Sequence, residues 1–279
     1  KALEVNTTGN FNTASGYQSL EQNTTGARNI AIGYQAYDDA DTEDDNLAIG
    51  FAALGGAIAG GTKNIAIGNY SLDANTSGIN NTAIGYDAMT TNIGGDKNTS
   101  VGFQSLQANT EGNKNVAVGM YSMYANTTAA DNVAVGYESM KVNTTGTRNI
   151  AIGYGAYDAA DTESDNLAIG YDALGGAIEA NGDFNIAIGN YSLDANTSGG
   201  DNVAVGYNTL SANTTGSFNT ATGFKALEAN TSSTYNTALG YQSMLKTATG
   251  GSYNTGLGAR SLETNTTGDD NTAVGVNSM

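Results

Sequence analysis

The six residues Asn29-Ile30-Ala31-Ile32-Gly33-Tyr34 recur with small variations about every seventeen residues along the 279-residue chain. Sixteen such blocks begin at Asn12, Asn29, Asn46, Asn64, Asn81, Asn98, Asn115, Asn132, Asn149, Asn166, Asn185, Asn202, Asn219, Asn236, Asn254 and Asn271. Self-similarity at a fixed period is typical of solenoids, in which each unit buries its apolar face only against its neighbours. The sequence therefore predicts one repeat domain over residues 1–279.

We number each unit from its first Asn, so that a coil runs from position one to position seventeen. Positions two and four often carry large or β-branched apolar side chains, such as Ile65 and Ile67, while position three is almost always Ala. This two-residue alternation predicts a strand. We expect a second short extended stretch at positions six to nine, for example Tyr86-Asp87-Ala88-Met89. The Asn-Thr-Thr-Gly sequence at positions twelve to fifteen should turn the chain, because Asn tolerates left-handed conformations and Gly accepts positive φ.

Helical arrays are the structural alternative, but their units need about 33 residues or more. Each unit here also contains two glycines as a rule, and a glycine inside a helix costs about 1 kcal/mol relative to Ala. The sequence therefore predicts an all-β parallel β-solenoid of about sixteen 17-residue coils. With neighbouring strands about 4.8 Å apart, the coils would form a rod on the order of 75 to 80 Å long.

Stacked coils place identical positions above one another. The Asn residues at positions one and twelve should then form columns whose amides hydrogen-bond along the axis. Aromatic residues at position six should form another column, which the sequence breaks at Asn69, Met120 and Asn190. These rings would either pack between coils or subunits, or present a surface to a sugar or a protein partner.

The composition excludes several classes of function. Ten basic and 27 acidic residues give a net charge of −17, which opposes binding to nucleic acid and to anionic membranes. No apolar run approaches the roughly 20 residues of a membrane span, so we expect no membrane insertion. The chain has no His and no Cys, and therefore no imidazole base, thiol nucleophile or common zinc site. No unique carboxylate pair suggests a glycosidase, and we predict neither an enzyme nor a cofactor other than a metal ion.

Two coils depart from the pattern in the same way, at residues 38–45 and 158–165, where acidic corners containing Asp-x-Glu-x-Asp replace Asn-Thr-Thr-Gly. Alternating carboxylates resemble the start of an oxygen-rich Ca²⁺ loop, although the glycine and the distant Glu of an EF-hand are absent. The candidate Ca²⁺ ligands are Asp41, Glu43, Asp45, Asp161, Glu163 and Asp165. A solvated acidic corner that adds solubility is the plainer alternative. Each corner precedes a Gly-rich corner, at 55–62 and 175–182, where contacts with other molecules are expected.

The Asn-Thr-Thr and Asn-Thr-Ser tripeptides also match the acceptor pattern for N-glycosylation. They begin at Asn6, Asn23, Asn75, Asn126, Asn143, Asn196, Asn213, Asn230 and Asn265. Turn chemistry explains these residues equally well, so the sequence leaves their modification open.

The tandem units Asn-Thr-Ala-[Ile/Val]-Gly-Tyr and Leu-x-x-Asn-Thr-Thr-Gly resemble the repeats of bacterial surface proteins and of phage tail-fibre-like proteins. Their Ala-Ile-Gly step is also distantly similar to the β-roll heads of trimeric autotransporter adhesins, although seventeen residues is longer than the adhesin head unit. The resemblance covers the whole chain. It implies an extracellular fibre, at a cell surface or on a virion, and a homo-oligomer for which a trimer is one possible assembly.

We therefore expect a structural fibre or filament shaft, such as an adhesin or tail fibre, which acts by rigidity and reach. Both ends stop in mid-pattern without a cap, so we expect either a segment of a longer fibre or a subunit that stacks end to end. The partners would be further copies of the chain and a cell-surface receptor or glycan. The alternatives are a glycan-binding surface and an ice-binding one. Ice binding by the adjacent Thr residues of positions thirteen and fourteen is disfavoured, because neighbours in a strand face opposite sides.

Overall fold

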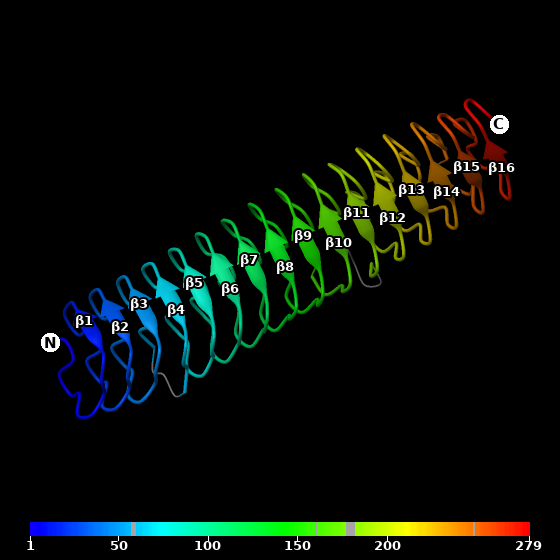
Figure 1. The fold of residues 1–279 in the computed structure, drawn as a ribbon. Helices are drawn as coiled ribbons and strands as arrows, with labels where there is room; N and C mark the ends of the chain where they lie inside the picture. The colour runs from blue at the N-terminus through cyan, green and yellow to red at the C-terminus, as the bar shows by residue number, and fades with distance from the viewer. Residues whose placement is uncertain (57–59, 160, 177–181, 248) are drawn as a thin grey trace. The chain divides into compact units, whose positions relative to one another are not determined.

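A computed structural model describes residues 1–56, 60–159, 161–176, 182–247 and 249–279 (Figure 1). The described chain is all-β and forms a parallel β-solenoid whose coils repeat about every seventeen residues, which confirms the predicted fold class. It falls into two compact units, Lys1–Thr145 and Gly146–Met279, which are built from the same coil. The single domain over residues 1–279 stays a prediction.

Each coil contributes one strand of three residues, at positions two to four (Figure 1). The first unit contains β1 (Thr13–Ser15), β2 (Ile30–Ile32), β3 (Leu47–Ile49), β4 (Ile65–Ile67), β5 (Thr82–Ile84), β6 (Thr99–Val101), β7 (Val116–Val118) and β8 (Val133–Val135). The second unit contains β9 (Ile150–Ile152), β10 (Leu167–Ile169), β11 (Ile186–Ile188), β12 (Val203–Val205), β13 (Thr220–Thr222), β14 (Thr237–Leu239), β15 (Thr255–Leu257) and β16 (Thr272–Val274).

Within each unit every strand pairs in parallel with the next, and equal positions face each other. Ala31 of β2, for example, pairs with Ala48 of β3. We call each stack of residues at one position a column. Because the register is the same throughout a unit, a property of one position becomes a property of a whole column.

The predicted second strand at positions six to nine is wrong. In the coil of β5, Asp87 and Met89 have φ angles of 53° and 52°, and the same two positions are left-handed in most coils. A left-handed residue at every second position curls the chain, so this stretch forms turns instead of an extended segment. Position nine, which holds Leu, Met or Tyr, is thereby turned into the interior.

The interior is narrow and is filled by small side chains. Position three, Ala in nearly every coil, is fully buried in most strands, and position eight adds a buried Ala, Ser or Thr. The one large apolar side chain that most coils bury completely is that of position nine, such as Leu72 or Met123. Consequently the β-branched residues of positions two and four lie on the outside of the coil.

Glycine is required at position five, which is Gly in all sixteen coils. Gly33 has a φ of +140°, and a Cβ atom there would lie 2.2 Å from the carbonyl oxygen of Gly50 in the next coil. The prediction that the corner glycine of position fifteen needs positive φ is wrong, because Gly26 does not adopt such an angle. At Gly26 the restriction is steric, since a Cβ would approach Asn23 Oδ1 to 2.4 Å.

Two buried columns of Asn hold neighbouring coils together, as predicted from the sequence. At position one, Asn12 Oδ1 accepts a hydrogen bond from the backbone N–H of Asn29 at 2.9 Å, and Asn29 Nδ2 donates to the carbonyl of Glu43 in its own coil at 2.7 Å. At position twelve, Asn92 Nδ2 donates to Asn75 Oδ1 at 2.8 Å. The amides thus supply the polar contacts of an interior that is too small for an apolar core alone.

Candidate functional site

The outward face of the strands is a continuous array of apolar and hydroxyl side chains. Positions two and four point away from the buried Ala between them, as in β2, where Ile30 and Ile32 are 39% and 41% exposed. These columns carry Ile, Val, Leu and Thr in both units, and one Ser, Ser15, in the first. The face follows directly from the size of the interior, because only Ala fits inside and the larger residues must lie outside.

An aromatic column runs along the same face at position six. Tyr17, Tyr34 and Phe51 stack with ring centroids 5.4 Å apart. The second unit repeats this arrangement with Tyr207, Phe224 and Tyr241.

The sequence predicted breaks in this column at Asn69, Met120 and Asn190, and the breaks are wrong. Each of these residues is followed by a Tyr at position seven, and that Tyr fills the gap edge-on. Tyr70 lies 5.2 Å from Phe51 and 5.9 Å from Tyr86, with interplanar angles of 69° and 81°. The dipeptides Asn-Tyr and Met-Tyr could have indicated a continuous column from the sequence, because a Tyr ring at position seven still reaches the rings of position six.

Columns two, four and six contain no charged residue in any of the sixteen coils, although the chain has 27 acidic and ten basic residues. Charges appear instead at position seventeen, beside this face, where Arg28 pairs with Asp45 at 2.5 Å and Lys114 with Asp131 at 3.5 Å. The hydrogen bond from Arg28 holds the pKa of Asp45 below its usual value. Position seven also carries charges, and Lys225 and Arg260 lie over the rings of Phe224 and Tyr241. Uncharged columns rich in aromatic residues, with charges beside them, have the anatomy of a protein interface.

The acidic corners are organised around Glu43 and Glu163, which are buried although they are charged residue types. Glu43 Oε2 accepts hydrogen bonds from the backbone N–H groups of Asp41 and Thr42 at 3.1 and 3.0 Å, and Glu163 makes the same contacts in its own corner. Each glutamate therefore caps its corner from the inside.

Other candidate Ca²⁺ ligands bind protein groups outside the corner. Asp45 and Asp165 form bidentate pairs with Arg28 and Arg148, and Asp41 accepts a hydrogen bond from the hydroxyl of Thr24. The described residues gather no group of three or more metal-binding side chains. The Ca²⁺ site at Asp41, Glu43, Asp45, Asp161, Glu163 and Asp165 thus gains no support from these contacts and stays a prediction.

Sequence reasoning missed the residues that make the acidic corners possible. Position nine is Tyr157 instead of Leu or Met, and the Tyr157 hydroxyl donates to the carbonyl of Glu163 at 3.3 Å. In other coils the Asn of position twelve donates to this carbonyl, as Asn23 does to Gly26 at 3.1 Å. Position twelve is Ala40 in the first corner and Ala160 in the second. The joint change of Leu or Met to Tyr at position nine and of Asn to Ala at position twelve could therefore have indicated this altered corner from the sequence.

Most of the possible glycosylation acceptors are buried in the folded coil, whereas Asn6 and Asn265 near the two ends are partly buried. The Asn of position twelve is fully buried in the interior coils, and Asn213 Nδ2 donates to Asn196 Oδ1 and to the carbonyl of Gly216. The nitrogen that a glycan would modify is therefore occupied, and turn chemistry and packing account for these tripeptides.

The Gly-rich corners 55–62 and 175–182 were expected to make contacts, but their residues 57–59 and 177–181 lie outside the described residues. Within the described ranges, no helix has the length and the hydrophobicity that a membrane crossing requires. A comparison with protein families, curated proteins and solved structures finds no match. The assignment of function therefore rests on the geometry of the coil.

Proposed function

We propose that this chain is a structural segment of an extracellular fibre, and that copies of it associate side by side through the outward face of the strands. The observation that carries the proposal is the absence of charge from columns two, four and six in a strongly acidic chain. Burying this face against other copies would remove apolar and aromatic side chains from water, at about 25 cal/mol per Å². A fibre of this kind acts by rigidity and reach.

Two further features support the proposal. Columns two, four and six are uncharged in every coil of both units, so a similar contact can form at each coil, whereas a catalytic site needs a unique constellation. The setting outside a cell or on a virion, and an assembly of three copies, come from the resemblance of the repeat to surface and tail-fibre-like proteins. Closed homo-oligomers bury matching faces, which a uniform face provides.

Light scattering of the purified chain tests the association. We expect a mass that is a multiple of the single-chain mass, with melting that depends on concentration. Ile84→Lys places a charge in column four, and this variant should shift the mass towards the single chain. Thr25→Lys adds the same charge at position fourteen and serves as the control, because Thr25 is exposed on a corner. A wild-type chain that is monomeric at every concentration would contradict the proposal.

Ice binding is the second candidate function. Its candidate residues are now the outward Thr residues of the strands instead of the Thr residues of the corners. The outward residues of β13, Thr220 and Thr222, are two apart in the strand and point the same way, and Thr continues along column two at Thr237, Thr255 and Thr272. Such spacing presents a flat array of hydroxyl and methyl groups. Thermal hysteresis at micromolar protein that is lost in Thr237→Lys would support this function, and freezing at the equilibrium point would eliminate it.

A further inference from the structure

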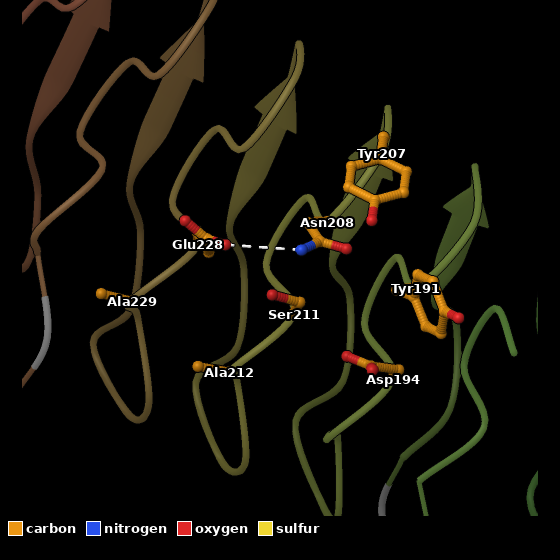
Figure 2. Close-up of a pocket in the computed structure, with 8 residues that line it drawn as sticks. All are labelled: Tyr191, Asp194, Tyr207, Asn208, Ser211, Ala212, Glu228 and Ala229. Atoms are coloured by element: carbon orange, nitrogen blue, oxygen red, sulfur yellow. Dashed lines mark hydrogen bonds between the residues drawn. The ribbon is translucent and has the colours of Figure 1, made fainter.

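A hollow of about 660 Å³ lies in the second unit, on the turns that follow β11, β12 and β13 (Figure 2). It is lined by Tyr191, Asp194, Tyr207, Asn208, Ser211, Ala212, Glu228 and Ala229. No residue of columns two or four takes part, but Tyr191 and Tyr207 belong to the aromatic column, so the hollow adjoins the face through which copies are proposed to associate.

The size of Ser211 and Ala212 explains why the surface is hollowed here. They occupy positions ten and eleven, where the corresponding coil of the first unit has Thr90 and Thr91. There, Thr90 Oγ1 donates to the backbone carbonyl of Tyr70 at 2.9 Å, so the larger Thr side chain lies against that residue. The smaller pair in the second unit leaves the equivalent space beside Tyr191 open.

Tyr191 presents an aromatic face to this space. Its ring makes angles of 63° with Tyr171 and 89° with Tyr207, so it meets the rings of both neighbouring coils edge to face. In the regular column the rings cover one another, as Tyr207 and Phe224 do at an angle of 10°. The turned ring, which is only half-buried, therefore has a face that the aromatic column does not cover.

The polar lining is rich in hydrogen-bond acceptors. Asn208 Nδ2 donates to Glu228 Oε1 at 3.4 Å, while Asn208 Oδ1 is shielded from water without a partner among the described residues. Asp194 and Glu228 add two carboxylates, of which Glu228 is paired with Lys225 at 2.7 Å. The ligand-facing acceptors are therefore the two carboxylates, and a ligand that donates hydrogen bonds would suit them.

We propose that this hollow binds one or two sugar rings of a neutral glycan, with a C–H face against Tyr191 and hydroxyl groups donating to Asp194 and Glu228. An aromatic face with a few convergent polar groups is the usual form of a small-ligand site, and the volume lies within the usual range. The two carboxylates and the net charge of −17 disfavour sialylated, uronic or phosphorylated sugars. This binding role does not depend on the fibre role, because the hollow is formed by residues of a single chain.

Saturation-transfer NMR with neutral trisaccharides of glucose, mannose, galactose and N-acetylglucosamine tests the proposal. We expect at least one probe to receive saturation, strongest at the C–H protons of one ring face, and trigalacturonic acid to receive none. Tyr191→Ala should raise the Kd at least tenfold, whereas Tyr191→Phe should retain binding because it keeps the ring. Tyr70→Ala, in the equivalent coil of the first unit, is the matched control and should leave the Kd unchanged.

The double variant Ser211→Thr/Ala212→Thr provides an independent test that keeps every polar group of the lining. It copies the residues of the first unit, so it is compatible with the fold, and it should abolish binding by filling the space. The proposal is overturned if none of the neutral probes binds at 10 mM, if the double variant binds as well as the wild type, or if the hollow instead takes Ca²⁺ or an acetyl-lysine amide in preference to every sugar.

Discussion

Single residues in this coil are constrained by the distance to the next coil. Gly33 illustrates the constraint, because its positive φ and the 2.2 Å approach of the Gly50 carbonyl act on the same atom. Corner positions are less strict. Ala129 stands at position fifteen, where most coils have Gly, and the Asn126 Nδ2 bond to its carbonyl is 3.4 Å long. The interior thus admits an extra methyl group at a corner by weakening a hydrogen bond.

Gly33→Ala should lower the free energy of unfolding of the first unit by about 2 to 5 kcal/mol, because left-handed strain and overpacking act together. Gly250→Ala is the control, since Gly250 also has positive φ, +96°, but a Cβ there would meet nothing within 4 Å. That variant should cost only about 1 to 2 kcal/mol. Urea denaturation measures both. Equal costs would mean that contact between coils is not the constraint.

At the level of one element, the acidic corner behaves as a coupled set. The Tyr37 hydroxyl accepts a hydrogen bond from Asn46 Nδ2 at 2.5 Å, and burial raises the pKa of this phenol well above its usual value. Asn23 Oδ1 has no partner among the described residues, because Ala40 follows it in the column. The corner has therefore exchanged one amide of the Asn column for a buried phenol.

Replacing Tyr37 and Ala40 by the Leu and Asn of the other coils should show that the two positions are coupled. In Ala40→Asn alone, the new amide has to share its space with the Tyr37 side chain. Tyr37→Leu alone leaves a void and removes a hydrogen-bond acceptor, which should lower the free energy of unfolding by about 1 to 3 kcal/mol. The double variant Tyr37→Leu/Ala40→Asn should be more stable than the sum of the two changes allows, by at least about 1 kcal/mol. A double-mutant cycle in urea measures this energy. Strict additivity would show that the two positions are independent.

The turn that contains Asp38 should make stability depend on pH. Burial, followed by the nearby charge of Asp39, raises the pKa of Asp38 to about 6. The folded coil then keeps this proton up to about pH 6, whereas the unfolded chain releases it near pH 4. Between these values the folded state binds more protons, so the contribution of Asp38 to stability is fully present below about pH 4 and is lost as the pH rises through 6.

Urea midpoints of the first unit between pH 4 and 7.5 measure this dependence. We expect Asp38→Asn to flatten the profile over that window, because the group that takes up the proton is gone. Asp45→Asn is the contrasting variant, since Arg28 lowers the pKa of Asp45 and its contribution is lost as the pH falls. If Asp38→Asn leaves the slope between pH 4 and 7.5 unchanged, other groups control it.

At the scale of the whole molecule, one coil is the smallest segment that can be added or removed while the register of the other coils is kept. The backbone and side-chain hydrogen bonds of one coil end mainly on the coil before and the coil after, at the same positions. Stability in such arrays is close to a sum of unit terms and contacts between neighbours. An entire coil can therefore be removed without disturbing the contacts of the others.

Deletion of residues 98–114 removes one coil and joins Lys97 to Asn115. We expect this chain to fold, with β5 pairing directly with β7, and to lose only the contribution of one coil to stability. Deletion of residues 98–113 removes one residue fewer and is the matched control. It should disrupt the Asn columns, because positions no longer align. Circular dichroism and melting measure the outcome, and similar melting of both chains would argue against a fixed register.

The sequence by itself determined the period, the strand at positions two to four and the Asn columns, because sixteen copies oversample one local rule. It did not determine which side of the strand faces inward, and its second strand was wrong. Alternation of Ala31 with Ile30 and Ile32 reads the same for either orientation. Only the tertiary structure decided that the small residues lie inside, because the left-handed turns at positions seven and nine bring Leu or Met and two Asn columns into a space that leaves room only for Ala.

The candidate sites divide in the same way. Absence of charge from columns two, four and six is a sequence property, but its meaning depended on those columns being outward. The hollow beside Tyr191 needed the structure entirely, since it brings together residues of three coils. The hollow is open because Ser211 and Ala212 are small and leave space beside Tyr191, whose ring stands at position seven instead of position six. Sequence repeats determine what every coil shares, whereas packing between particular side chains decides where one coil differs from the next.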